Sequence, residues 1–154
     1  MNMRDKIKTK FQIKAISEKL KPQGKKIVFT NGCFDILHRG HVEYLAKAKK
    51  MGDVLIVGLN SDSSVKKIKG PKRPLNNEKD RAIVLSALEV VDYVVVFSED
   101  TPYNLIKSIK PDVLVKGGDW KPKDIVGNDI AKKTVSIPFI KGYSTTCMIG
   151  RIGR

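Results

Sequence analysis

The sequence predicts one α/β domain with a Rossmann-like fold: a doubly wound parallel sheet of about five strands with helices on both faces. Short apolar runs alternate with helix-like segments along the chain, which is typical of parallel sheets covered on both sides. The 154 residues fit a single domain of ordinary size. With 41% hydrophobic residues, the chain can bury a core, which excludes disorder as a description of the whole.

Five apolar runs are the expected strands. They cover residues 27–29, 54–59, 91–97, 113–115 and 135–139, and each of the first four is followed by polar residues or glycine. Ligands of doubly wound folds bind beyond the carboxyl ends of the strands. We therefore expect function in the loops after the first, second, fourth and fifth runs.

Helical patterns separate these runs. Apolar residues recur at helical spacing over residues 41–51, and Gly52 stands at the usual stop position. Asn77 is a suitable N-cap for a second helix, because Asp80 follows three residues later. Two further helices are expected over residues 101–110 and 144–152.

Two segments lie outside this alternation. Residues 1–24 are rich in Lys and are expected to form a basic N-terminal helix or arm ahead of a domain over residues 25–154. Residues 63–76 carry five Lys or Arg among one Gly and two Pro. Because Gly and Pro interrupt regular structure, this second segment is expected to be a basic loop.

Charge and cysteine content narrow the class of protein. The excess of 30 Lys and Arg over 16 Asp and Glu gives a net charge of +14, which favours anionic partners such as nucleotides, phosphorylated metabolites or nucleic acid. The two cysteines exclude a disulfide framework, and no Cys/His spacing suits a protein-bound metal. The charged N-terminus is unlike a signal peptide, and no apolar run is long enough to span a membrane. We therefore expect a cytoplasmic protein with no membrane partner.

A pair of histidines follows the first expected strand. His38 and His41 flank Gly40 where that strand ends and a helix begins. Glycine permits close approach of a ligand, and free N–H groups at a helix start favour phosphate. Two imidazoles beside one phosphate can stabilise its charge, as nucleotidyl transfer requires. A packing role for one histidine is the alternative, and it suits a lone histidine better than this pair.

These residues resemble known motifs. His38-Arg39-Gly40-His41 resembles the H-x-G-H signature of the nucleotidyltransferase superfamily that includes the cytidylyltransferases, and Ser144-Thr145-Thr146 resembles its second signature. Over about residues 24–153 the chain looks like the adenylyltransferase domain of the ADP-heptose synthase family. The segments that carry this closer resemblance are 29–35, 60–66, 69–74 and 116–119.

The resemblance implies transfer of AMP from Mg²⁺-bound ATP to D-glycero-β-D-manno-heptose 1-phosphate, with release of pyrophosphate, in the synthesis of a lipopolysaccharide core precursor. It also implies a homodimer. Many members of the family carry this domain fused behind a sugar kinase, and because no kinase is recognised in this sequence, the kinase that makes the acceptor is expected to be a separate chain. No metal site in the protein itself is expected.

Position and resemblance together assign expected roles. His38 and His41 are the expected catalytic residues. Cys33 is interpreted as a small filler of the turn, since no base is assigned to it. The expected nucleotide-binding residues are Thr30, Asn31, Gly32, Phe34, Gly40, Gly117, Gly118, Asp119, Ser144, Thr145 and Thr146. The expected acceptor-binding residues are Asn60, Asp62, Lys69, Arg73 and Arg81.

Two other functions stay open at this point. One is a cytidylyltransferase acting on glycerol 3-phosphate or a similar acceptor, which is disfavoured because Phe139 stands where such relatives carry Arg. The other is a basic nucleic-acid-binding module, against which stand the 6% aromatic content and the lack of an aromatic-rich strand motif. A redox Rossmann enzyme is disfavoured because no G-x-G-x-x-G follows the first run.

Overall fold

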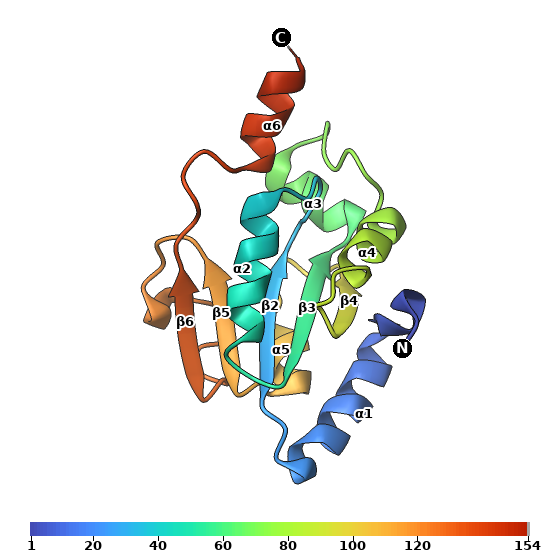
Figure 1. Cartoon of the computed structure of the whole chain (residues 1–154), viewed down its shortest axis with the longest axis vertical. Helices are drawn as coiled ribbons and strands as arrows, with labels where there is room; N and C mark the ends of the chain where they lie inside the picture. Colours follow the sequence, from blue (N-terminus) through green and yellow to red (C-terminus); the bar gives the residue numbers. More distant parts are fainter. Residues whose placement is uncertain (154) are drawn as a thin grey trace.

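The computed structural model describes residues 1–153 and contains a six-stranded sheet in which all paired strands are parallel (Figure 1). The spatial order is β1-β4-β3-β2-β5-β6. The strands are β1 Ile7–Lys8, β2 Ile27–Gly32, β3 Val54–Asn60, β4 Tyr93–Phe97, β5 Val113–Gly117 and β6 Lys133–Ile137. The chain runs outward from β2 to β3 and β4, then returns to the other side of β2 for β5 and β6. This order confirms the doubly wound fold.

The count of about five strands is corrected to six. β1 is a two-residue edge strand in which Ile7 pairs with Val94 of β4. It lies within the N-terminal segment that the sequence indicated only as a helix or arm. Two residues, one of them Lys8, are too few to form an apolar run.

Helices cover both faces of the sheet. They are α1 Lys10–Leu20, α2 Arg39–Lys49, α3 Asp62–Lys69, α4 Glu78–Ser86, α5 Tyr103–Ile109 and α6 Thr145–Ile152. Short 3-10 turns lie at Met3–Lys6, Lys21–Gln23 and Pro122–Asp124. No helix within residues 1–153 is long and apolar enough to cross a membrane.

Successive strand residues point into two separate cores. Val28 packs with Leu45 of α2 and Leu85 of α4 on one face. Its neighbour Phe29 packs with Ile13 of α1, and with α5, on the other face. All of these residues are fully buried. Because side chains alternate across a strand, a run buried on both faces is apolar at every position, as the sequence suggested.

The expected basic loop over residues 63–76 is half helix. Ser61 is the N-cap of α3 and accepts a hydrogen bond from the Ser64 N–H at 3.3 Å. Val65 is the only buried apolar residue of this helix. Ser and Lys fill most other positions, so its apolar stripe is too weak to be recognised by period, and only residues 70–77 remain a loop.

The order in which the chain adds strands to the sheet reverses at β2, which pairs with both β3 and β5. Phe29 lies between Ile56 of β3 and Leu114 of β5. The loops that leave β2 and β5 must therefore diverge at their carboxyl ends, which opens a crevice between them. The segment after β6 and the start of α6 lie above that edge (Figure 1).

Candidate functional site

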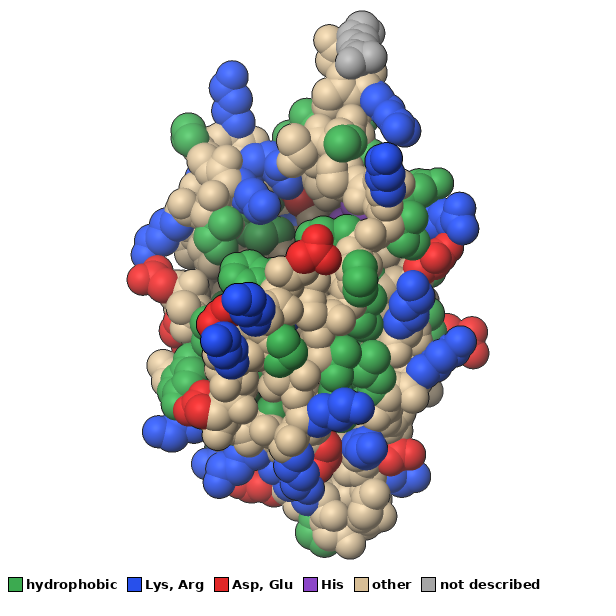
Figure 2. Space-filling view, turned by 90° about the vertical axis from the view of Figure 1, so that its left-hand side faces the viewer, with side chains coloured by type: hydrophobic (Ala, Val, Ile, Leu, Met, Phe, Trp, Pro, Cys, Tyr) green, Lys and Arg blue, Asp and Glu red, His purple; other side chains and the backbone are tan. Residues whose placement is uncertain are grey.

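A cavity of about 770 Å³ lies at the carboxyl ends of the central strands. Its wall comes from the β2–α2 loop, the end of α3, the residues after β5 and the segment from β6 into α6. Histidine surface is visible at the base of the hollow in the upper part of the space-filling view (Figure 2). Of the expected site residues, the cavity is lined by Asn31, Gly32, Phe34, His38, Gly40, His41, Asn60, Lys69, Arg73, Gly117, Ser144, Thr145 and Thr146.

The two histidines lie against each other. His38 is the N-cap residue of α2, and its ring stacks on that of His41 with centroids 3.8 Å apart and an interplanar angle of 21°. The Phe34 ring meets His41 edge-on at 5.2 Å. The Nδ1 atoms of both histidines are buried and have no hydrogen-bond partner among the residues described.

Burial keeps both rings neutral. It lowers the pKa of His41 to about 4, with a smaller contribution from the neighbouring His38, and it also lowers the pKa of His38. A neutral imidazole carries one N–H and one free acceptor nitrogen. Near pH 7 each neutral ring therefore has one N–H group that can donate a hydrogen bond to an anion in the cavity.

Gly40 is needed by the protein's own packing. A Cβ at this position would lie 2.9 Å from Cε1 of His38 and 3.0 Å from Cβ of Tyr143. Glycine thus lets the segment before α6 approach the histidine ring closely. The expectation that Gly40 serves ligand approach alone is incomplete.

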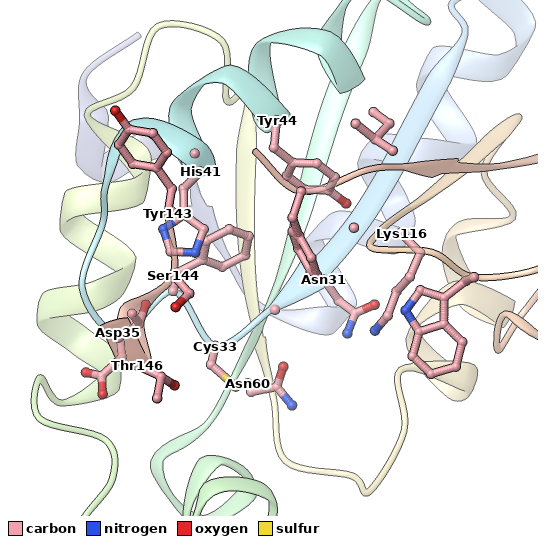
Figure 3. Close-up of a pocket in the computed structure, with 18 of the residues that line it drawn as sticks. Asn31, Cys33, Asp35, His41, Tyr44, Asn60, Lys116, Tyr143, Ser144 and Thr146 are labelled. Carbon is pink, nitrogen blue, oxygen red and sulfur yellow. The ribbon is translucent and has the colours of Figure 1, made fainter. Parts of the chain in front are cut away.

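The start of α6 lies on the same side of the cavity as the histidines. Ser144 is the N-cap and accepts a hydrogen bond from the Cys147 N–H at 3.0 Å. The Thr145 hydroxyl donates to the carbonyl of Ile36 at 3.3 Å, which ties α6 to the β2–α2 loop. The first turn of a helix leaves N–H groups free and carries partial positive charge. His41, Tyr143, Ser144 and Thr146 therefore surround a position suited to an anion (Figure 3).

Asp35 holds the loop after α3 against the cavity. Its carboxylate accepts hydrogen bonds from the Leu75 and Asn76 N–H groups and pairs with Nε of Arg73 at 2.7 Å. Burial opposes ionisation of Asp35, but the hydrogen bonds from Asn76, Leu75 and Arg73 outweigh it and lower its pKa. Asp35 thereby fixes Arg73 at the cavity wall, where we expected it. The sequence did not indicate this role of Asp35.

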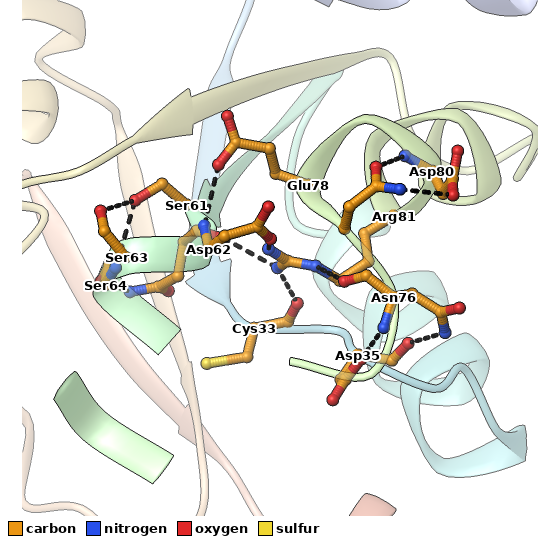
Figure 4. Close-up of polar contacts among 12 residues, drawn as sticks. Cys33, Asp35, Ser61, Asp62, Ser63, Ser64, Asn76, Glu78, Asp80 and Arg81 are labelled. Atoms are coloured by element: carbon orange, nitrogen blue, oxygen red, sulfur yellow. Dashed lines mark hydrogen bonds and ion pairs between the residues drawn. The ribbon is translucent and has the colours of Figure 1, made fainter. Parts of the chain in front are cut away.

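Arg81 and Asp62 do not line the cavity, so the structure does not bring them together with the other residues expected to bind the acceptor. Arg81 is 2% exposed, and its guanidinium donates to the carbonyls of Cys33, Asn60 and Asn76 at 2.7, 2.8 and 2.9 Å (Figure 4). It also pairs with Oδ1 of Asp62 at 2.8 Å. A guanidinium bound in this way joins the ends of β2 and β3 to the basic loop, and four of its five N–H groups are engaged within the protein.

Thr30, which was expected to bind the nucleotide, does not line the cavity. It is fully buried, and its hydroxyl lies 2.5 Å from that of Tyr44. Burial raises the pKa of Tyr44 to about 12. Thr30 therefore positions Tyr44, which does line the cavity, instead of binding a nucleotide directly.

The loop after β5 differs from expectation at two of three positions. Gly118 and Asp119 do not line the cavity, and only Gly117 does. A Cβ at Gly117 would lie 2.8 Å from Cε1 of Phe139. The Phe139 ring therefore packs on the main chain at Gly117, while Asp119 is exposed to solvent.

Cysteine chemistry is not favoured at this site. Burial raises the pKa of the Cys33 thiol, so the thiol stays protonated near neutral pH, and thiolate is the nucleophilic form. Within residues 1–153, no group of three or more His, Cys, Asp or Glu could hold a metal ion. A metal that enters with a polyphosphate would be held mainly by its oxygens.

The sequence did not single out several lining residues, among them Lys116, Trp120 and Tyr143. Lys116 is the first residue of the 116–119 motif and Trp120 directly follows that motif, so this position was the available signal. Tyr143 precedes the N-cap of α6 and lies near both His38 and Arg39. Only the fold shows that this tyrosine reaches the start of α2.

The chain matches known proteins over most of its length. Residues 29–145 match the family described as cytidylyltransferase-like. The chain is 62% identical over 141 residues to the bifunctional protein HldE of a Nitratiruptor species, covering 92% of this chain and 30% of that protein. It is 61% identical over 151 residues to the bifunctional protein HldE of Aliarcobacter butzleri, covering 98% and 32%. It thus spans only about 30% of the length of these curated relatives.

Solved structures show the same fold. A crystal structure described as the lipopolysaccharide core biosynthesis protein from Thermoplasma volcanium GSS1 has a TM-score of 0.67 and 33% identity, covering 77% of this chain and all of that one. A pantoate-beta-alanine ligase from Francisella tularensis has a TM-score of 0.62, and at 22% identity it shares the fold alone; it covers 86% of this chain and 66% of that one.

Proposed function

The chain belongs to the cytidylyltransferase-like family, and on this basis we propose that it transfers AMP from ATP to a heptose 1-phosphate, forming ADP-heptose and pyrophosphate. The observation that carries the proposal is the stacked, neutral pair of His38 and His41 beside the start of α6. ATP and the heptose are supported by the motif resemblance. The description of the Thermoplasma volcanium structure as a lipopolysaccharide core biosynthesis protein supports a sugar of that pathway.

The proposed step is an in-line displacement at the α-phosphorus. An oxygen of the sugar 1-phosphate forms a bond to this phosphorus, the bond to the oxygen that bridges to the β-phosphate breaks, and pyrophosphate leaves with the electron pair. The attacking phosphate is already ionised near pH 7, so no base is required. Mg²⁺ bound to ATP supplies neutralisation of the polyphosphate charge.

In this step the protein binds the phosphates and stabilises their negative charge with hydrogen-bond donors in fixed positions. His38 and His41 donate hydrogen bonds to the α-phosphate and to the leaving oxygen. The hydroxyls and free N–H groups from Ser144 to Thr146 hold the β- and γ-phosphates at the positive end of α6. Fixed donors in an enclosed cavity need little reorganisation during the reaction, which is the main source of rate enhancement in such sites.

A substrate panel tests the proposal. With Mg²⁺ and each common nucleoside triphosphate, offered against sugar and polyol phosphates, pyrophosphate release should show the highest kcat/KM for ATP with heptose 1-phosphate. A higher value for CTP with glycerol 3-phosphate would establish the cytidylyltransferase alternative. Absence of pyrophosphate with every pair, together with salt-sensitive binding of DNA or RNA, would establish the basic-module alternative.

We also propose a homodimer in the cytoplasm, where ATP is available, with no nucleic-acid or membrane partner. Sedimentation should give twice the 17.2-kDa chain mass, and a single-chain mass at micromolar concentration would refute the dimer. Because the acceptor is a sugar phosphate, we propose that a sugar kinase supplies it. The curated relatives are named bifunctional, so in them a second activity shares the polypeptide.

A further inference from the structure

Lys116 is a partly buried cation that has no carboxylate partner and lies near the ring of Trp120. It lies in β5 and lines the cavity, yet it has no ion pair or hydrogen bond within the described part of the chain. The other two buried cations of this region do have carboxylate partners: Arg73 pairs with Asp35, and Arg81 with Asp62. Burying an unpaired charge is costly, so the missing partner requires an explanation.

A second lysine without an ion pair borders the same cavity, and it is exposed to solvent. Lys69, the last residue of α3, also lines the cavity and has no ion pair among residues 1–153. Burial lowers the pKa of Lys116, and the charge of Lys69 lowers it further, whereas Cys33 acts in the opposite direction. Both lysines line the same cavity. A bound anion would neutralise both, and a phosphate has enough oxygens to accept from each.

The position of Lys116 indicates which phosphate this is. In the close-up, Lys116 lies on the opposite side of the cavity from His41 and Ser144, and the Asn31 side chain lies between them (Figure 3). An in-line displacement needs the attacking and leaving oxygens on opposite sides of the α-phosphorus. If the histidine side takes the leaving pyrophosphate, the lysine side faces the attacking group.

We propose that Lys116 joins Lys69, which the sequence already assigns to the acceptor, in an anion site that binds the phosphate of the acceptor and aims its oxygen at the α-phosphorus. The identity of this phosphate rests on the proposed function, whereas the anion site itself rests on the place of Lys116 in the cavity wall without a carboxylate partner. Arg73, fixed through Nε by Asp35, borders the same cavity and adds positive charge to it.

The fluorescence of Trp120 can report binding at this anion site. Trp120 is the only tryptophan of the chain, and Nζ of Lys116 lies 5.8 Å from the centre of its ring. Without nucleotide, titration of the protein with glucose 1-phosphate, and separately with inorganic phosphate, should change the Trp120 fluorescence saturably. Lys116→Met should weaken this binding by about 10- to 100-fold, as expected for loss of a charged hydrogen bond.

Matched variants separate the site from general charge effects. Lys121→Met removes an exposed lysine next to Trp120 that does not line the cavity, and it should titrate like the unmodified protein. Lys116→Arg keeps the charge and should retain most of the affinity. In turnover, Lys116→Met should raise KM for the acceptor by the same factor while KM for ATP stays within about twofold.

Each outcome bears on the inference separately from the proposed function. Equal titrations for Lys116→Met and the unmodified protein would overturn the anion site. A fluorescence change caused by ATP, but not by the sugar phosphate, and lost in Lys116→Met would overturn its assignment to the acceptor. The expected titrations without pyrophosphate release from any substrate pair would uphold the anion site and refute the proposed function.

Discussion

Replacement of His41 with alanine is expected to lower kcat by at least about 100-fold while the fold is kept. The side chain stacks on His38 at the cavity wall, and its buried Nδ1 has no partner in the described structure. Its pKa of about 4 keeps it neutral, so the loss is that of one aligned hydrogen-bond donor to the transition state. Pyrophosphate release under saturating substrates gives kcat, and the melting temperature reports the fold.

Two variants on the same helix or at the same position control this experiment. Val42→Ala alters an exposed neighbour on α2 and should leave kcat within about twofold. His41→Asn keeps a neutral N–H donor on a shorter side chain and should recover part of the lost rate. Near-normal turnover of His41→Ala at an unchanged melting temperature would refute the catalytic role.

The sheet and its order could be predicted because the determining signal is local. Each central strand is buried on both faces, so residues such as Val28 and Phe29 are both apolar. Alternation with helices then requires parallel strands and right-handed crossovers. β1 and α3 escaped prediction because little of either is buried: β1 has two half-buried residues, and in α3 only Val65 is a buried apolar side chain.

The site residues also fall into those that local sequence predicts and those whose positions only the fold determines. The histidine pair and Ser144 to Thr146 form contiguous motifs, and the end of β2 and the start of α6 bring them to one cavity. Thr30 and Arg81 also stand in or near motifs, yet the fold buries them, and Asp62 pairs with Arg81. Two of the three carbonyls that accept hydrogen bonds from the Arg81 guanidinium are distant from it in the sequence. Composition and motif spacing therefore could not predict these hydrogen bonds.

Arg81→Met is expected to lower the free energy of unfolding by about 3–5 kcal/mol, because it removes a buried guanidinium that donates hydrogen bonds to three main-chain carbonyls and to the half-buried Asp62. The substitution keeps the length and apolar stem of the side chain. It leaves the carbonyls of Cys33, Asn60 and Asn76 without their donor, and each buried acceptor left unsatisfied is costly. Denaturant unfolding followed by circular dichroism measures the change.

The matched control for this prediction is Arg39→Met. Arg39 is exposed, and its ion pair with Glu43 lies on the surface of α2 with side chains 65% and 38% exposed, so its loss should change the free energy of unfolding by less than about 0.5 kcal/mol. Arg81→Met should also reduce acceptor binding only as far as the protein unfolds, because Arg81 does not line the cavity. If instead stability were unchanged and KM for a substrate rose sharply, Arg81 would bind substrate phosphate, as the sequence alone had suggested, and its contacts within the protein would not contribute to folding.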